Sequence, residues 1–150
     1  MAVFPTRLLL ATDGSPDAGR AAQTAVELSQ QTGSELHLVH VGEFLPTYLA
    51  QTEEEPAQLR EAARRLLEEE TRKVSEAGVA VAGSHLRLGR PAEEVVALSE
   101  ELSVGVIIVG SRGMSALRRA LMGSVSDSVV RHAHCPVFVV RANDAGHANP

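Results

Sequence analysis

The order of hydrophobic and polar positions divides the chain into alternating strand-like and helix-like segments. Short runs rich in apolar and β-branched residues cover 7–12, 35–41, 79–88, 104–109 and 137–140. The runs at 7–12 and 104–109 are almost continuously apolar, which is typical of parallel strands covered on both faces. The run at 35–41 alternates instead, and His37 and His40 interrupt its apolar positions.

Apolar residues at helical spacing fill the gaps between these runs. An alanine-rich stripe covers 16–32 and ends before Gly33, a natural helix stop. Further stripes lie at 59–77, 91–102 and 124–134. Because strand-like and helix-like segments alternate, the pattern predicts an α/β fold with a parallel sheet and helices on both faces. The exceptions are a long connection at 42–56 and a tail at 142–150 that we expect to fray.

Length and composition narrow the class of protein. The 150 residues suit a single domain over 1–150, and a formal net charge of −5 argues against a nucleic-acid binder. The single cysteine allows no intramolecular disulfide, which fits a reducing compartment. The apolar runs are too short to span a bilayer, and the start of the chain has no targeting pattern. We therefore expect a cytoplasmic protein with no membrane or nucleic-acid partner.

The richest candidate chemistry lies in the segment 110–126, between the fourth strand and the last helix. Its glycines permit tight turns, and Ser124 and Ser126 stand beside the unpaired amides of a helix N-terminus, which bind phosphate well. Arg112 adds positive charge nearby. The segment lacks the lysine of a P-loop and is not a GxGxxG motif. On spacing alone, a phosphate site and an ordinary strand–helix turn are both open.

The positions of the strand ends also favour a ligand site. Ligands of open α/β sheets bind beyond the carboxyl ends of the strands. Asp13, Val41 and Gly110 each stand at such an end, so we expect them at one edge of the sheet. Asp13 is either a turn residue at the helix entry or a hydrogen-bond partner of a ribose, a base or a phosphate-bound metal.

Four stretches, in the right order, resemble the ATP-binding subgroup of the universal stress protein family. That subgroup carries Gly-x2-Gly-x9-Gly-Ser/Thr, and Gly110, Gly113, Gly123 and Ser124 match every fixed position. The other stretches are LLATDGS at 9–15, GRPA at 89–92, and the closing segment from GSVS at 123–126 to HAHCPV at 132–137. The resemblance covers about residues 4–141.

This resemblance implies a Rossmann-like, open five-stranded sheet of order 3-2-1-4-5 with ATP as the ligand. Adenine and ribose would lie near Thr12, Asp13 and Val41. The ribose and phosphates would follow Gly110 and Gly113, and the phosphates would be cradled by Gly123, Ser124, Val125 and Ser126 with Arg112 close by. Mg²⁺ or Mn²⁺ could accompany the phosphates, although the sequence shows no dedicated metal site.

The last strand is also a candidate for pairing between two copies. Residues 136–141 would form an edge of the sheet, and an uncapped apolar edge invites a partner strand. The family pairs at this place, so we expect a homodimer that buries Val137, Phe138 and Val139. The alternative is that the tail covers this edge.

Three functions compete on this reading. The leading one is a nucleotide-binding regulatory protein, linked to stress responses through the resemblance alone. The second is a slow ATPase or nucleotidyl-transferring enzyme, for which only Asp13 stands out as a base and no P-loop lysine is present. The third is a ligand-free dimeric interaction module. We expect no catalytic residue.

Some polar residues have simpler interpretations. His132, His134 and Cys135 resemble a metal cluster only superficially, because their spacing is tight and they stand at a helix end. Cys135 is expected to be a small, partly buried residue rather than a nucleophile. We expect Glu68, Glu69 and Glu70 to be solvated, and the arginines of the same helix to pair with its glutamates.

Overall fold

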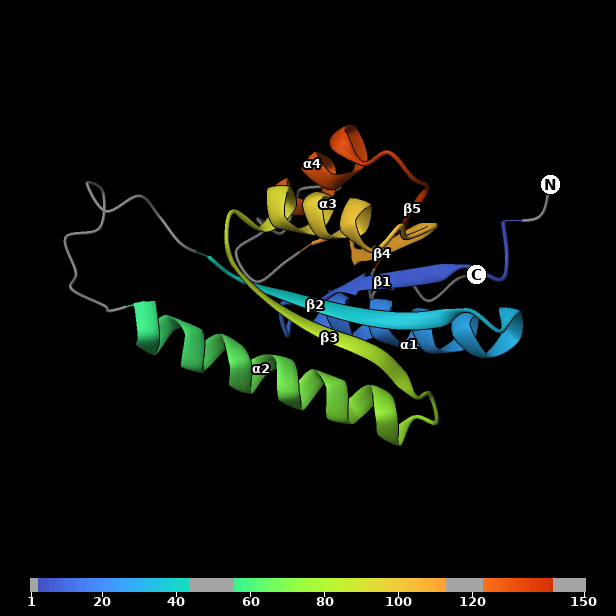
Figure 1. Ribbon diagram of the computed structural model, residues 1–150, viewed down its shortest axis with the longest axis horizontal. Helices are drawn as coiled ribbons and strands as arrows, with labels where there is room; N and C mark the ends of the chain where they lie inside the picture. The colour runs from blue at the N-terminus through green and yellow to red at the C-terminus, as the bar shows by residue number, and fades with distance from the viewer. Residues whose placement is uncertain (1–2, 44–55, 113–122, 142–150) are drawn as a thin grey trace, which may run out of the picture.

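The computed structural model describes residues 3–43, 56–112 and 123–141. The elements along the chain are β1 (Arg7–Ala11), α1 (Pro16–Thr32), β2 (Glu35–Glu43), α2 (Pro56–Glu76), β3 (Val81–Gly89), α3 (Pro91–Glu101), β4 (Val106–Gly110), α4 (Ser124–His132) and β5 (Val137–Val140). All strands are parallel, in the order β3-β2-β1-β4-β5. In Figure 1, α1 and α2 cover one face of the sheet, and α3 and α4 cover the other. The predicted α/β fold and strand order are confirmed.

Two apolar cores lie on either side of the sheet. Successive strand residues point to opposite faces, so the central strands β1 and β4 feed both cores. Beneath α1 and α2 the core includes Leu8, Leu10, Leu36, Leu38 and Ile108. Beneath α3 and α4 it includes Leu9, Val39, Val95, Ile107 and Val129. Burial on both faces explains why the sequence of β1 and β4 is almost continuously apolar.

The predicted helix ends of α1 are confirmed in detail. The hydroxyl of Ser15 accepts a hydrogen bond from the amide of Ala18 at 3.2 Å, which satisfies one of the unpaired donors of the first turn. Gly33 ends the helix in the left-handed conformation, with φ of 72°. α3 likewise begins with Pro91 in its first turn, as expected. None of the helices in the described ranges is both long and apolar enough to cross a membrane.

Most strand boundaries differ from the predicted ones by one or two residues. Val79 and Val104 are buried, yet they precede β3 and β4 rather than belonging to them. Apolar turn residues that pack into a core extend the hydrophobic pattern beyond the hydrogen-bonded strand. β2 continues to Glu43 instead of ending at 41, and α4 ends at His132 rather than at 134. The connection at 44–55 and the tail at 142–150 lie outside the described residues.

A pair of histidines joins β2 to β3. The Nδ1 of His37 lies 3.2 Å from the Nε2 of His85, and the two rings are stacked. Gly83 makes room for them, since a β-carbon there would come within 2.9 Å of a nitrogen of each ring. Burial, then the neighbouring charge of His37, lowers the pKa of His85. His37, which interrupts the apolar pattern of β2, therefore pairs with a residue of the neighbouring strand.

This pair makes the stability of the domain pH-dependent. A histidine whose pKa is lower in the folded state than its ordinary value of about 6.5 stabilises the fold above that value and loses this contribution as the pH falls. We expect the urea midpoint of the wild type to fall between about pH 7 and about pH 5.5. His85→Gln should flatten this dependence. An unchanged slope in His85→Gln would contradict the assignment.

Candidate functional site

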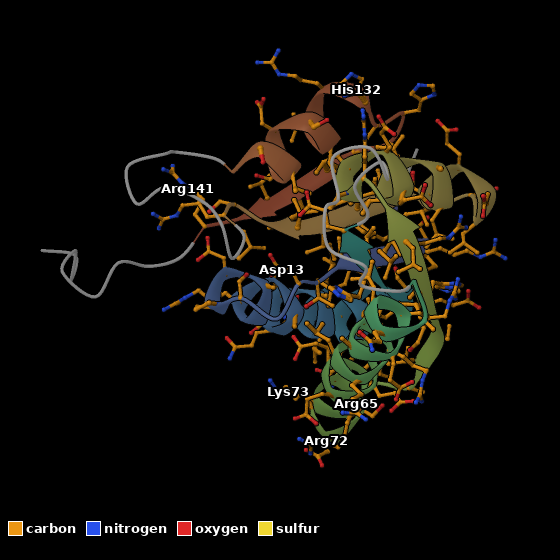
Figure 2. All side chains as sticks on the ribbon, turned by 90° about the vertical axis from the view of Figure 1, so that its left-hand side faces the viewer. Asp13, Arg65, Arg72, Lys73, His132 and Arg141 are labelled. Atoms are coloured by element: carbon orange, nitrogen blue, oxygen red, sulfur yellow. The ribbon has the colours of Figure 1, made fainter. Side chains whose placement is uncertain are left out.

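A cavity of about 380 Å³ opens at the edge of the sheet where the strands end. Figure 2 looks onto this edge, with Asp13 near its middle. The cavity is lined by the predicted site residues Thr12, Asp13, Val41, Gly110, Arg112, Gly123, Ser124, Val125 and Ser126. The remaining predicted residue, Gly113, lies outside the described residues. The structure thus brings together strand ends that are far apart in the sequence, in a volume typical of small-molecule sites.

One side of the cavity is apolar. β2 contributes Val39 and Val41, and α2 contributes Leu59, Ala63 and Leu66. Val39 and Val41 belong to the core beneath α3 and α4, whereas α2 lies on the other face of the sheet, so this side of the cavity draws on both faces. A flat, weakly polar ring system would displace water there, because covering apolar surface lowers the free energy of the system.

The opposite side holds the beginning of α4. Gly123 is the N-cap, and the first amide to bond back into the helix is that of Asp127, which donates to the carbonyl of Gly123 at 3.0 Å. The amides of Ser124, Val125 and Ser126 therefore have no partner within the helix. The hydroxyl of Ser126 donates to the carbonyls of Ser111 and Gly123 at 2.8 and 3.1 Å. What Ser126 can offer to an anion is consequently its amide, not its hydroxyl proton.

A buried carboxylate on α1 holds the end of β4. Asp17 is 6% exposed, and its Oδ2 accepts hydrogen bonds from the hydroxyl of Ser111 at 2.9 Å and from the amide of Arg112 at 3.0 Å. The Nε of Arg112 lies 3.8 Å from the same oxygen. Asp17 does not stand out in the sequence, because an acidic residue in a first turn is already explained by the helix dipole.

Asp13 fulfils the turn role that the sequence left open. Its Oδ1 accepts a hydrogen bond from the amide of Ser15 at 2.9 Å, a contact that shapes the entry to α1. Asp13 also lines the cavity. A carboxylate accepts several hydrogen bonds at once.

The end of β1 is tied to its neighbours by two contacts that the sequence analysis missed. The hydroxyl of Thr12 donates to Oε1 of Glu70 at 3.0 Å, and the carbonyl of Thr12 accepts from Nδ1 of His40 at 2.7 Å. Glu70 is 7% exposed, so the prediction that it is solvated is wrong. The position of α2 over β1 buries its carboxylate, which also pairs with Lys73 at 3.0 Å.

The rest of the outer surface of α2 behaves as predicted. Arg64 pairs with Glu61 and Glu68, and Arg72 pairs with Glu69 and Glu76. Figure 2 shows Arg65, Arg72 and Lys73 on this helix, away from Asp13. Exposed pairs of this kind contribute little to stability.

The histidines and the cysteine near the end of α4 lie outside the cavity lining. Cys135 is half-buried and packs against the core beneath α3 and α4, and burial raises the pKa of its thiol. The prediction of a partly buried small residue is confirmed, and less of the reactive thiolate forms at neutral pH. In the described part of the chain, no three histidine, cysteine, aspartate or glutamate side chains are placed to hold a metal ion.

Comparison with known proteins places this geometry in a family. The model of the universal stress protein family matches residues 5–141. Universal stress protein YxiE of Bacillus subtilis is 31% identical over 148 residues, covering 90% of this chain and 98% of its own. A universal stress protein of Thermus aquaticus, in the QAH/OAS sulfhydrylase 3′ region, is 38% identical over 138 residues, covering 89% and 97%.

Solved structures share the fold. Hypothetical protein MJ0577 superposes with a TM-score of 0.79 at 28% identity, covering 93% of this chain and 97% of its own. A universal stress protein in complex with cAMP superposes with a TM-score of 0.72 at 20% identity, covering 91% and 97%. One from Archaeoglobus fulgidus in complex with dAMP superposes with a TM-score of 0.66 at 22% identity, covering 93% and 99%.

Proposed function

This chain belongs to the universal stress protein family, and we propose that it is a regulatory protein that binds an adenine nucleotide, with ATP as the preferred ligand. The observation that carries the proposal is the placement of two unlike surfaces on either side of Asp13. Free amides of α4 lie on one side, and the apolar slot between β2 and α2 lies on the other. A nucleotide has the same division, with an anionic end and a flat base joined by a ribose.

The polarity of the cavity orients the nucleotide. The N-terminus of α4 carries a partial positive charge and outward amides, which together favour phosphate. Arg112 lines the same side of the cavity. The base then occupies the slot beside Val41 and Leu66, and the ribose lies next to Asp13. Two family structures, in complex with cAMP and with dAMP, make an adenine nucleotide the first ligand to test.

A divalent ion would accompany the phosphates rather than occupy a site of the protein. Mg²⁺ prefers oxygen ligands and is often held by one or two carboxylates together with substrate phosphates. Asp13 and Glu43 are the carboxylates among the described residues that line the cavity. Either could join the coordination of Mg²⁺ or Mn²⁺ brought in by ATP.

We propose binding without efficient hydrolysis. Phosphoryl transfer needs a positioned water and cations on the γ-phosphate. Arg112 is the cationic side chain that lines the described part of the cavity, and its guanidinium lies 3.8 Å from Asp17. We expect turnover slower than about 1 s⁻¹, the low end of ordinary enzymes. Turnover of several per second, abolished by Asp13→Ala while binding persists, would favour the ATPase alternative.

Binding is tested by releasing any ligand from the purified protein for mass spectrometry, followed by calorimetric titration with ATP, ADP, AMP and cAMP. Gly123→Val puts a branched side chain at the N-cap beside the amides of α4, and valine is a poor N-cap. We expect the affinity for ATP to fall roughly tenfold, equivalent to about 1.4 kcal/mol. Gly19→Val is the matched control, because a β-carbon at Gly19 meets nothing within 4 Å. Equal affinity in all three proteins would refute the phosphate assignment.

The chain is also proposed to form a homodimer through β5. This strand stands at the end of the sheet and pairs with β4 on one side. Phe138 is 47% exposed, whereas Val137 and Val139 already pack against the core beneath α3 and α4. Of the three residues expected at the interface, Phe138 therefore offers the most surface to a second copy.

Sedimentation velocity at micromolar concentration tests the dimer. We expect the wild type to sediment as a dimer and Phe138→Lys as a monomer, because a charge would be buried at the edge strand. Val3→Lys is the control, since Val3 is also exposed but lies outside the sheet. A wild type that stays monomeric would favour the alternative of a covered edge.

A further inference from the structure

His40 has one ring nitrogen that is fixed by the protein. It lies on β2, is 9% exposed and forms part of the cavity wall. Its Nδ1 lies 2.7 Å from the carbonyl oxygen of Thr12. A carbonyl oxygen can only accept a hydrogen bond, so Nδ1 carries the proton. The neutral ring therefore presents Nε2 as a hydrogen-bond acceptor.

The Nε2 of His40 has no hydrogen-bond partner among the described residues. It differs from the Nε2 of His37, which also lacks a hydrogen-bond partner there but is buried and lies 3.7 Å from Oε2 of Glu35. His40 instead borders the cavity, beside Thr12 and the apolar residues of α2. A polar atom that is largely buried costs free energy until it is paired. A ligand that brings a donor to this place would recover that cost.

The position of His40 in the cavity indicates which part of a bound nucleotide would lie beside it. His40 shares a face of β2 with Leu36 and Leu38, the face that α2 covers. This is the base end of the cavity, separated by β1 from the amides of α4. The donor that an adenine base offers is its 6-amino group. Guanine and hypoxanthine carry a 6-oxo group, which is an acceptor, in the same position.

We propose that His40 is a specificity-determining residue, whose Nε2 accepts a hydrogen bond from the 6-amino group of adenine and disfavours 6-oxopurines. The inference rests on the proposed nucleotide site and names the group that selects the base. Two acceptors facing each other in a largely buried place repel, so a 6-oxopurine loses the hydrogen bond and gains an unfavourable contact.

The test compares ATP with inosine triphosphate, which differs in the base and has the same ribose and phosphates. We expect the wild type to prefer ATP by about tenfold.

His40→Asn separates the ligand contact from the structural one. The asparagine amide is placed like Nδ1 and can still donate to Thr12, but nothing remains at the position of Nε2. We expect the variant to unfold at a similar temperature and to bind both triphosphates with similar affinity. His37→Asn is the matched control, since His37 lies outside the cavity lining, and it should keep the wild-type ratio.

The outcomes distinguish the two proposals. If no purine nucleotide binds the wild type, the proposed function fails and this inference fails with it. If ATP binds but is not preferred over inosine triphosphate, or if His40→Asn keeps the preference, only the role of His40 is overturned. A His40→Asn protein that does not fold would instead show that His40 is structural, which also overturns the inference.

Discussion

Gly110→Ala is expected to destabilise the domain by about 2 kcal/mol and to weaken nucleotide binding. A β-carbon at Gly110 would stand 2.8 Å from the carbonyl carbon of Asp17 and 2.9 Å from its oxygen. These atoms belong to the backbone of α1, so they cannot turn aside as a flexible side chain would. The added methyl group must push the end of β4 away from the start of α1, which widens the cavity between them.

Urea unfolding of Gly110→Ala beside Gly19→Ala measures this effect. Gly19 lies within α1, and a β-carbon there would meet no other atom within 4 Å. Alanine in a helix interior is favoured over glycine by about 1 kcal/mol, so the control should be slightly stabilised. A Gly110→Ala protein as stable as its control would show that the end of β4 and α1 are not in firm contact.

The fold could be read from the sequence because its main signals are local. Apolar runs and helix stops such as Gly33 depend on neighbours along the chain, and the alternation of elements then restricts the topology. The strand order came with the family resemblance. Boundaries were less certain, because Val79 and Val104 are apolar for packing in turns and not for pairing in strands.

The residues that line the cavity could be predicted from the sequence, but the buried carboxylates that hold these residues in place could not. Asp13, Val41 and Gly110 stand at strand ends, which a topological rule places at one edge. Asp17 and Glu70 act on residues 95 and 58 positions away, through contacts with Arg112 and Thr12. Each already had a sufficient local explanation, one as a first-turn acid and the other as part of an acidic run. Without a three-dimensional model, nothing in the sequence separated them from solvated carboxylates.

The contacts of Asp17 fix the positions of the elements that border the cavity. The end of β4, the start of α1 and the start of α4 meet at Ser111, whose hydroxyl bonds to Asp17 and whose carbonyl accepts from Gly123 and Ser126. Pre-arranged amides bind an anion more tightly, because the cost of ordering them is met during folding rather than on binding.

Asp17→Ala is expected to have the largest effect on this junction. It removes the acceptor of the hydroxyl of Ser111 and of the amide of Arg112, both in a part of the structure with little access to water. Hydrogen bonds to a charged group contribute about 1.5–3 kcal/mol each, and unpaired buried donors are costly. We expect a loss of about 3 kcal/mol in the free energy of unfolding, together with weaker ATP binding.

Asp17→Asn is the matched variant, because it retains the shape and one carbonyl oxygen but removes the charge. Its stability should fall between the wild type and Asp17→Ala, since one amide oxygen can still accept from Ser111 or Arg112. Asp127→Ala is the surface control, because the carboxylate of Asp127 is half-exposed and pairs with the exposed Arg131. Urea unfolding gives the order of stability, and calorimetry with ATP shows whether affinity follows it. If Asp17→Ala is no less stable than Asp127→Ala, then Asp17 does not hold β4 to α1. If it is unstable but binds ATP as tightly as the wild type under conditions where it is folded, the amides of α4 are ordered without the junction.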